Sequence, residues 1–295
     1  MFIYRIFVTL VLLVMISACS GVGMGGNKKP EVVEDLSAEA LYSRGKQLLS
    51  KGRYLKAIDD FEEIERLYPF SQLSSNGQVM VAYALYKNEE YQASIEVINQ
   101  FVKLNPAHSD IAYMYYLKAI CYYERIADIK RDQGITQKAL AALKEVRRRF
   151  PDTYYARDAR FKEDLVYDHL AGKEIEIGRF YLKNRKYIAA INRFKVVIDD
   201  YQQTSQIQEA LYRSVEGYLS LGMMEEAKKH AALLGHNYPD SKWYRYAYAL
   251  VEKGENSPGA VKGDSWFSGL LGEEKSTDLP KDDNADSWIR NIFDF

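Results

Sequence analysis

Apolar residues recur at helical spacing over more than 200 residues of this chain, from Ser37 to about residue 252. Only short interruptions with Gly, Asn or Pro break the spacing, and alternating runs of β-branched residues are few. Such a pattern is typical of consecutive amphipathic helices. The sequence therefore predicts an all-α body.

The helical pattern also repeats itself. One segment fits the roughly 34-residue tetratricopeptide pattern, in which small residues let two helices approach and a proline ends the second helix. Its matching residues are Leu41, Gly45, Leu48, Gly52, Tyr54, Ala57, Phe61, Ile64 and Pro69. We therefore expect a pair of antiparallel helices between Ala38 and Pro69.

Four less regular copies follow, from Val81 to Pro106, Tyr115 to Pro151, Ile177 to Gln202 and Leu211 to Pro239. A charged insertion at 128–134 interrupts the third copy, and an additional helical stretch, Tyr154 to Leu170, precedes the fourth. A final helix from about Lys242 to Glu252 could cap the stack. Because five copies exceed the roughly three that a stable stack needs, we predict a tetratricopeptide solenoid of about five irregular helix pairs over residues 37–252.

The first residues indicate the compartment. Ile6 to Ile16 is an apolar run of eleven residues, shorter than the roughly 20 that span a bilayer and typical of a signal peptide. The segment Ile16 to Cys19 that ends it resembles the lipobox of bacterial lipoproteins. We expect residues 1–18 to be removed and Cys19 to be lipidated, with Ser20 favouring the outer membrane. The alternative is an ordinary secretory signal with a chance cysteine.

Two segments outside the repeats have the composition of disordered chain. Residues 19–36 are rich in Gly, and we expect a flexible tether. Residues 253–295 accumulate Gly, Ser, Pro and Asp, and 251–295 contain ten acids against five bases. We predict an acidic, disordered tail. Its apolar residues would serve either as docking motifs or as contacts with the chain's own solenoid: Trp266, Phe267, Leu270, Leu271, Trp288, Ile292 and Phe293.

The sequence shows no pattern of catalytic or metal-binding residues. The four histidines lack His-Glu-x-x-His spacing, and Cys121 stands in an apolar aromatic run. Paired acids such as Glu62-Glu63 lie beside Lys and Arg, as on a solvated helix face. We therefore expect no enzyme, no metal site and no cofactor.

The net charge is −1, and no Lys/Arg-rich stretch lies beside aromatic residues on a common face. Nucleic acid is therefore not an expected partner. Tyrosine is unusually frequent, with 24 residues, and many fall in the first helix of a repeat: Tyr42, Tyr83, Tyr86, Tyr113, Tyr115, Tyr116, Tyr122, Tyr123, Tyr181 and Tyr218. Some must be core, and the others would line a groove suited to an extended apolar peptide.

Lipobox, tether and irregular repeats together resemble the BamD (ComL) family, lipoproteins of the outer-membrane β-barrel assembly (BAM) machinery. Three segments carry the resemblance: Arg66 to Phe70, Phe101 to Pro106, and Tyr181 to Phe194. The resemblance covers about 35–250. It implies a periplasm-facing subunit that binds the POTRA domains of BamA, other BAM lipoproteins and unfolded outer-membrane β-barrel proteins.

Three residues take candidate roles from the resemblance. Arg193, with its neighbour Asn192, matches the position implicated in the BamA contact, and Tyr68 matches a corner near the client groove. The alternative interpretations are a surface arginine and a helix-ending tyrosine. The tail and the insertion at 128–134 depart from the family pattern. Two other functions stay open: a scaffold for pilus-secretin or cell-wall assembly, and a peptidoglycan-cleaving enzyme.

Overall fold

The computed structural model describes residues 36–256, which form eleven α-helices and no strand. The helices are α2 (Ala38–Ser50), α3 (Tyr54–Leu67), α4 (Gln72–Lys87), α5 (Tyr91–Leu104), α6 (Ile111–Tyr123), α7 (Gly134–Arg149), α8 (Tyr154–Lys183), α9 (Tyr187–Asp200), α10 (Ile207–Ser220), α11 (Met224–Asn237) and α12 (Lys242–Asn256). None of them is both long and apolar enough to cross a membrane. The predicted signal peptide, Cys19 and residues 257–295 lie outside the described part.

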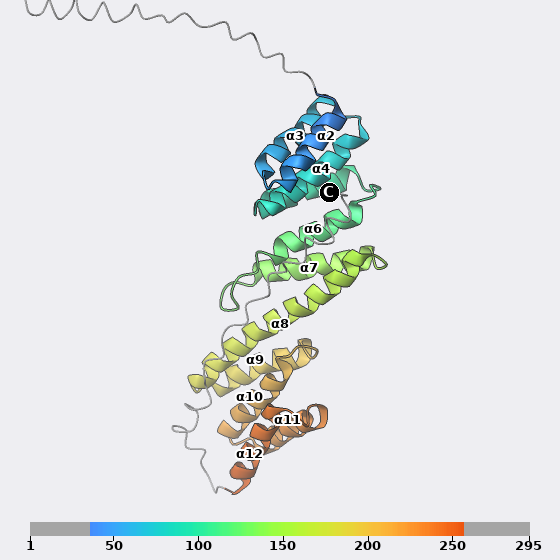
Figure 1. Ribbon diagram of the computed structural model, residues 1–295. Coiled ribbons are helices and arrows are strands. Elements are labelled where there is room, and N and C mark those ends of the chain that lie inside the picture. The colour runs from blue at the N-terminus through green and yellow to red at the C-terminus, as the bar shows by residue number, and fades with distance from the viewer. Residues whose placement is uncertain (1–35, 257–295) are drawn as a thin grey trace, which may run out of the picture. The chain divides into compact units, whose positions relative to one another are not determined.

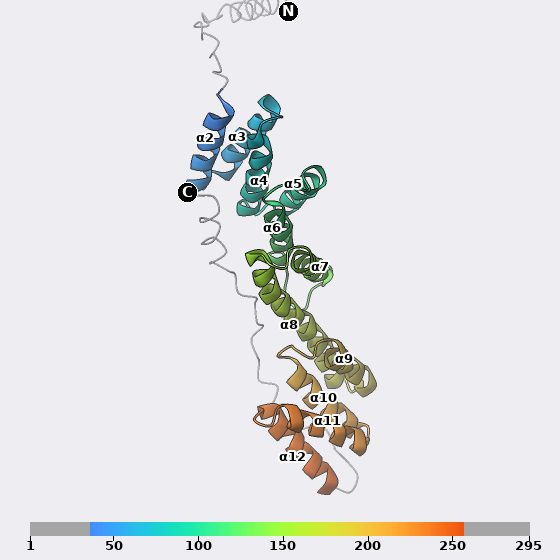
Figure 2. The same cartoon turned by 90° about the vertical axis from the view of Figure 1, so that its right-hand side faces the viewer.

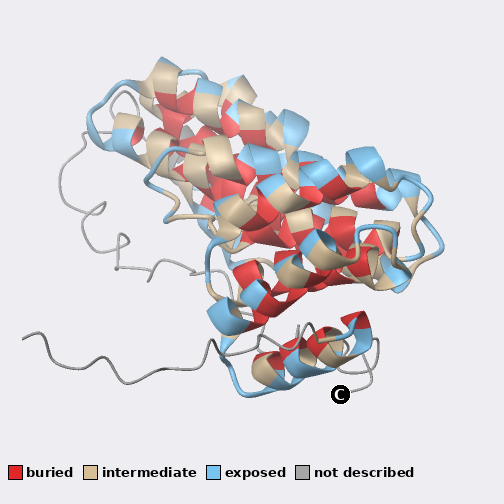
Figure 3. Cartoon of the chain, turned by 90° about the horizontal axis from the view of Figure 1, so that it is seen from above, coloured by how far each residue is buried: buried red, intermediate tan, exposed pale blue. Residues whose placement is uncertain are grey.

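The helices form five antiparallel pairs and a last single helix (Figures 1 and 2). Each helix contacts the next one along the chain, and each first helix of a pair also contacts the first helix of the following pair. Buried residues follow the faces that meet neighbouring helices (Figure 3). This arrangement confirms the predicted all-α tetratricopeptide solenoid.

The predicted helical stretch before the fourth repeat is not a separate element. It is the first half of α8, a single helix of 30 residues. Thr153 caps its start by accepting a hydrogen bond from the Ala156 backbone N–H at 3.2 Å. No proline interrupts α8. Gly172 is a weak helix former near the middle of the helix, and the Ile129 side chain packs against it. Repeats 3 and 4 therefore share one continuous helix.

Two glycines set the closeness of the helices in repeats 1 and 4. A Cβ on Gly45 would lie 2.7 Å from the Phe61 ring, and one on Gly178 would lie 2.2 Å from the Phe194 ring. Both phenylalanines are fully buried. These two Gly–Phe contacts allow the second helix of each pair to lie directly on the first.

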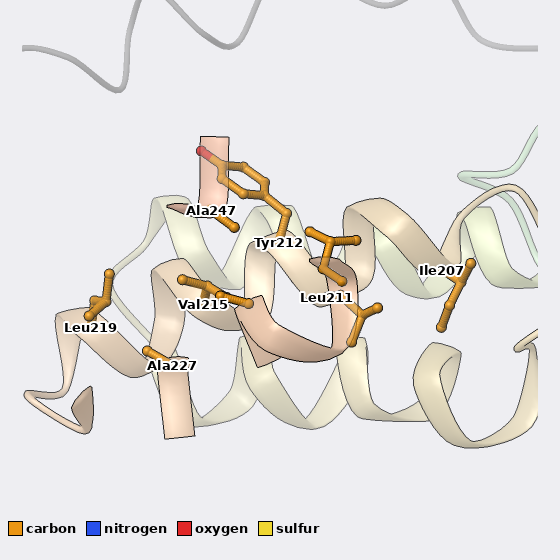
Figure 4. Packing of buried hydrophobic residues seen from close by; sticks show 9 residues of the cluster. Ile207, Leu211, Tyr212, Val215, Leu219, Ala227 and Ala247 are labelled. Atoms are coloured by element: carbon orange, nitrogen blue, oxygen red, sulfur yellow. The ribbon is translucent and has the colours of Figure 1, made fainter. Parts of the chain in front are cut away.

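The C-terminal end has its own apolar core (Figure 4). Leu211, Val215 and Leu219 of α10 lie against Ala227 of α11 and Ala247 of α12. The last helix begins at Lys242, as expected, and continues to Asn256, four residues beyond the expected end. Pro258 follows, a residue that cannot continue a helix. α12 therefore covers the end of the stack.

Four of the five pairs turn in the same way. Their turns place one residue in the left-handed region: Gly52 (φ 69°), Glu89 (φ 62°), Arg185 (φ 59°) and Gly222 (φ 74°). The next residue donates its backbone N–H to the carbonyl five residues earlier, as Lys186 does to Tyr181 at 2.9 Å. The turn is thus a property of the repeat, although only two of the four residues are glycine.

The third pair has the charged insertion in place of this turn. The Lys173 Nζ of α8 donates a hydrogen bond to the Lys130 carbonyl at 2.8 Å, and Ile129 packs at Gly172. Within the loop, the Asp128 side chain accepts from the Lys130 backbone N–H at 2.8 Å. The insertion therefore packs against the middle of α8.

Candidate partner-binding sites

Arg193 lies on α9 directly before the buried Phe194. Its Nη1 donates to Glu174 Oε2 of α8 at 3.1 Å, and 43% of its side chain is exposed. A guanidinium carries five N–H donors, so most of its donors stay available after this bond. Glu174 therefore orients a half-exposed arginine that can bind a second carboxylate.

Asn192 is exposed beside Arg193, and two large apolar side chains are exposed on the same two helices, α8 and α9. Ile188 precedes Asn192 by one helical turn and is 66% exposed, and Phe180 near the end of α8 is 63% exposed. The turn between these helices contributes the exposed cations Lys183, Arg185 and Lys186. We call Phe180, residues 183–186, Ile188, Asn192 and Arg193 the α8–α9 corner.

The sequence pattern alone did not single out Phe180 or Ile188. A signal was available for Ile188, because it stands outside the buried stripe of α9, which consists of Ala190, Ile191, Phe194 and Val197. An apolar residue off that stripe has no packing role in its own pair. The corner thus combines cations with an apolar surface, as protein interfaces do.

Tyr68 lies in the turn between repeats 1 and 2. It is partly buried, and its backbone N–H donates to the Ile64 carbonyl at 2.8 Å, which ends α3. Phe70, two residues later, is fully exposed. Ser71 then caps α4 by accepting from the Leu73 N–H. The fully exposed aromatic group of this turn is therefore Phe70, and a partner contact by the partly buried Tyr68 stays a prediction.

The corresponding turns show that Phe70 has no general packing role. Its position is taken by Ala107, Asp152, Gln203 and Asp240 in the other four turns between pairs. Small or polar residues suffice there, because the position faces solvent. Among the five turns between pairs, only this one carries a large exposed ring, which makes Phe70 a candidate for partner binding.

The ten tyrosines of the first helices serve mainly in packing. Tyr83, Tyr113, Tyr116 and Tyr123 are buried, the other six are partly buried, and none is exposed. Burial raises the pKa of Tyr116, whose hydroxyl donates to Asp158 Oδ2 at 2.5 Å. Of these ten tyrosines, only the six partly buried ones could therefore line a groove, through the exposed edges of their rings.

A charged network in the interior of α8 and α10 was not foreseen. Glu209 accepts two hydrogen bonds from Arg179 and one from Arg213 Nε at 3.2 Å. Arg213 also donates to Glu216 at 2.9 Å, and its guanidinium lies 5.7 Å from the Trp243 ring centre of α12. Burial raises the pKa of Glu216, and Arg213 opposes this shift only in part. The network links α8, α10 and α12.

Reactive groups are sparse among the described residues. They contain no group of three or more His, Cys, Asp or Glu that could hold a metal ion. The Cys121 thiol lies 3.5 Å from Ser94 Oγ, and burial raises its pKa to about 12. That thiol is therefore protonated at neutral pH and a poor nucleophile.

A family model and curated relatives match most of this chain. The model of a family described as "Outer membrane lipoprotein" matches residues 34–234. An outer membrane protein assembly factor BamD of Caulobacter vibrioides is 48% identical over 79% of this chain and 77% of its own. The BamD of Rickettsia prowazekii is 46% identical over 80% of this chain and 95% of its own.

Among solved structures, a thermophilic TPR protein of Thermus thermophilus is 21% identical. The match covers 74% of this chain and 100% of that chain, with a TM-score of 0.36.

Proposed function

Since this chain belongs to the family of outer membrane lipoproteins that includes the BamD assembly factors, we propose that it is a non-enzymatic subunit of the BAM machinery. In this role it binds the POTRA domains of BamA, other BAM lipoproteins and unfolded outer-membrane β-barrel proteins. The alternative scaffolds for pilus-secretin or cell-wall assembly have no specific support in its geometry.

We assign the BamA contact to the α8–α9 corner. The observation that supports it is the half-exposed Arg193, oriented by Glu174, with the exposed Asn192 and Ile188 on the same helix. A carboxylate of the partner would complete a charge-assisted pair with the guanidinium, and the apolar side chains would exclude water around it.

Charge reversal tests this assignment. Losing one partner of an interfacial charge pair costs about 2–5 kcal/mol, so Arg193→Glu should reduce recovery of BamA with the detergent-extracted chain more than about tenfold. The matched control is Lys56→Glu, which reverses an exposed charge on α3 of the first repeat. Both variants should keep the helical circular dichroism spectrum of the parent. Full recovery of BamA with Arg193→Glu would contradict the assignment.

We assign client binding to the N-terminal repeats, with Phe70 as its exposed aromatic contact. Phe70→Ala should lower photo-cross-linking to an unfolded β-barrel protein. Leu104→Ala, which removes an apolar side chain that is 61% exposed at the end of α5, should not. Equal losses in both variants would show unspecific apolar binding.

The proposed site of action is the periplasmic face of the outer membrane, with Cys19 as the lipid anchor. A tether of about 17 residues spans roughly 20–25 Å as a flexible coil, which keeps the first repeat close to the bilayer. Three acyl chains bind a membrane stably because each buried methylene contributes about 0.8 kcal/mol. Cys19→Ala should release the chain from the membrane fraction, and a membrane-bound variant would rule out this anchor.

A further inference from the structure

The first half of α8 presents a face that combines aromatic and basic residues. Tyr154, Arg157 and Arg160 are three residues apart, and Phe161 follows Arg157 by four residues and Tyr154 by seven, so the four share one side of the helix. All four are exposed, with Phe161 at 64% and Tyr154 at 48%. We call these four residues the α8 face. The sequence pattern had predicted no such combination on a common face.

The α8 face is exposed because α8 belongs to the packing of two repeats. Its first half packs on the third repeat, as shown by Tyr116 of α6 at Asp158 and by Arg147 of α7, whose Nε lies 3.4 Å from Glu163 Oε2. The fourth repeat packs on the second half instead, where Phe194 meets Gly178 (Figure 1). In a regular solenoid the next pair covers such a face. Here the next pair is displaced along the helix.

Positive charge dominates the α8 face. The Arg157 guanidinium lies 6.0 Å from the centre of the Tyr154 ring, and Arg160 has no ion pair with the described residues. Asp158, which follows Arg157 in the sequence, is only partly exposed and is engaged by Lys162 at 3.2 Å and by Tyr116. Asp164 is exposed one turn further along the helix. An acidic segment with aromatic side chains is complementary to this face.

We propose that the α8 face binds the acidic segment 257–295 of the same chain. This segment carries eight acids against four bases, and its aromatic residues are Trp266, Phe267, Trp288, Phe293 and Phe295. Its carboxylates would pair with Arg157 and Arg160. Its rings would pack on Phe161 and stack on the arginines, as aromatic rings do with guanidinium groups.

The segment is long enough to reach the α8 face. It follows the end of α12, and α12 contacts α10, which in turn contacts α8. Packed helix axes lie about 8–10 Å apart, so two such steps span roughly 20 Å. A flexible coil of 39 residues has an average span of about 31–37 Å. The α8 face lies about 20 residues before Gly178, where the fourth repeat packs, and this adds roughly 30 Å along α8. Fully extended, 39 residues span up to about 130 Å, so the segment can reach the face.

Photo-cross-linking of the full chain tests the proposal. With p-benzoylphenylalanine at position 161, mass spectrometry should find cross-links to peptides of 257–295 within the same molecule. Arg157→Glu combined with Arg160→Glu should lower their yield at least about fivefold. The matched control, Arg53→Glu with Lys56→Glu, reverses two exposed charges of the first repeat and should leave the yield unchanged. Salt near 1 M should also lower the yield, because it shortens the Debye length to about 3 Å.

A second variant leaves the folded region untouched. Asp282→Asn, Asp283→Asn and Asp286→Asn together remove three charges of the segment and should lower the cross-link yield in the same direction. Mixing labelled and unlabelled chains distinguishes contacts within a molecule from contacts between molecules. Cross-links only between two copies, or none to 257–295, would overturn the proposal.

Discussion

Repeats 1 and 4 have the same packing contact but opposite charges beside it. In both, a buried phenylalanine of the second helix lies on a glycine of the first: Phe61 on Gly45 and Phe194 on Gly178. The residue before the phenylalanine pairs with the first helix in each case. In repeat 1 it is Asp60, bound by Arg44 at 2.6 Å, and in repeat 4 it is Arg193, bound to Glu174.

The exposure of these two residues differs as well. The Asp60 side chain is 9% exposed, whereas 43% of the Arg193 side chain is exposed. The Gly–Phe contact recurs because helix closeness requires it. The adjacent position is free to change sign and exposure, so it is the position at which one repeat can differ from another in its partners.

The inner helices of the two ends differ in a related way. From Val79 to Leu85, α4 buries seven consecutive apolar residues. α10 buries Glu209, Arg213 and Glu216 among its apolar residues. The N-terminal end is therefore held mainly by apolar burial, and the C-terminal end also depends on buried ion pairs.

Removing the shared packing contact should have the largest effect. Phe61→Ala and Phe194→Ala should each lower the free energy of unfolding by about 3–5 kcal/mol, because each leaves a cavity beside a glycine that cannot fill it. Urea unfolding followed by circular dichroism measures both. A large loss in one variant and almost none in the other would show that the two repeats do not depend equally on the contact.

Breaking the buried network should have a somewhat smaller effect, confined to the C-terminal end. Glu209→Gln leaves Arg213 buried without its full charge compensation and should cost about 3 kcal/mol. Glu63→Gln breaks the exposed Glu63–Arg66 pair and is the control, with little change expected. If Glu209→Gln were as mild as the control, the network would have no structural importance.

Substitutions in the turns should change the free energy of unfolding least. Introducing a glycine should raise it, and removing one should lower it. Glu89→Gly and Arg185→Gly should each raise the free energy of unfolding by about 0.5–1 kcal/mol, because glycine adopts a positive φ without strain. Gly52→Ala and Gly222→Ala should lower it by a similar amount. Thermal unfolding under identical conditions measures all four. A loss in Glu89→Gly would mean that its side chain contributes more than the strain costs.

The sequence was sufficient to predict the fold where a residue type has a single structural role, such as a small residue at a close helix contact. Gly45, Ala57 and Phe61 indicated a helix pair, and that pair is present as α2 and α3. It failed for Glu209 and Arg213, since charged residues on a helix are usually solvated and only the packing of α8 and α12 shows that these are buried. It did not single out Phe70, because exposure within a turn depends on where the next helix begins.

The 30-residue helix α8 also affects how the chain unfolds. Repeat proteins can unfold in steps, since each unit depends only on its nearest neighbours. Here the third and fourth units are built on one helix, so melting either of them removes the support of the other. Repeats 3 and 4 should therefore unfold in a single cooperative transition, and any partly unfolded intermediate should lose or keep them together.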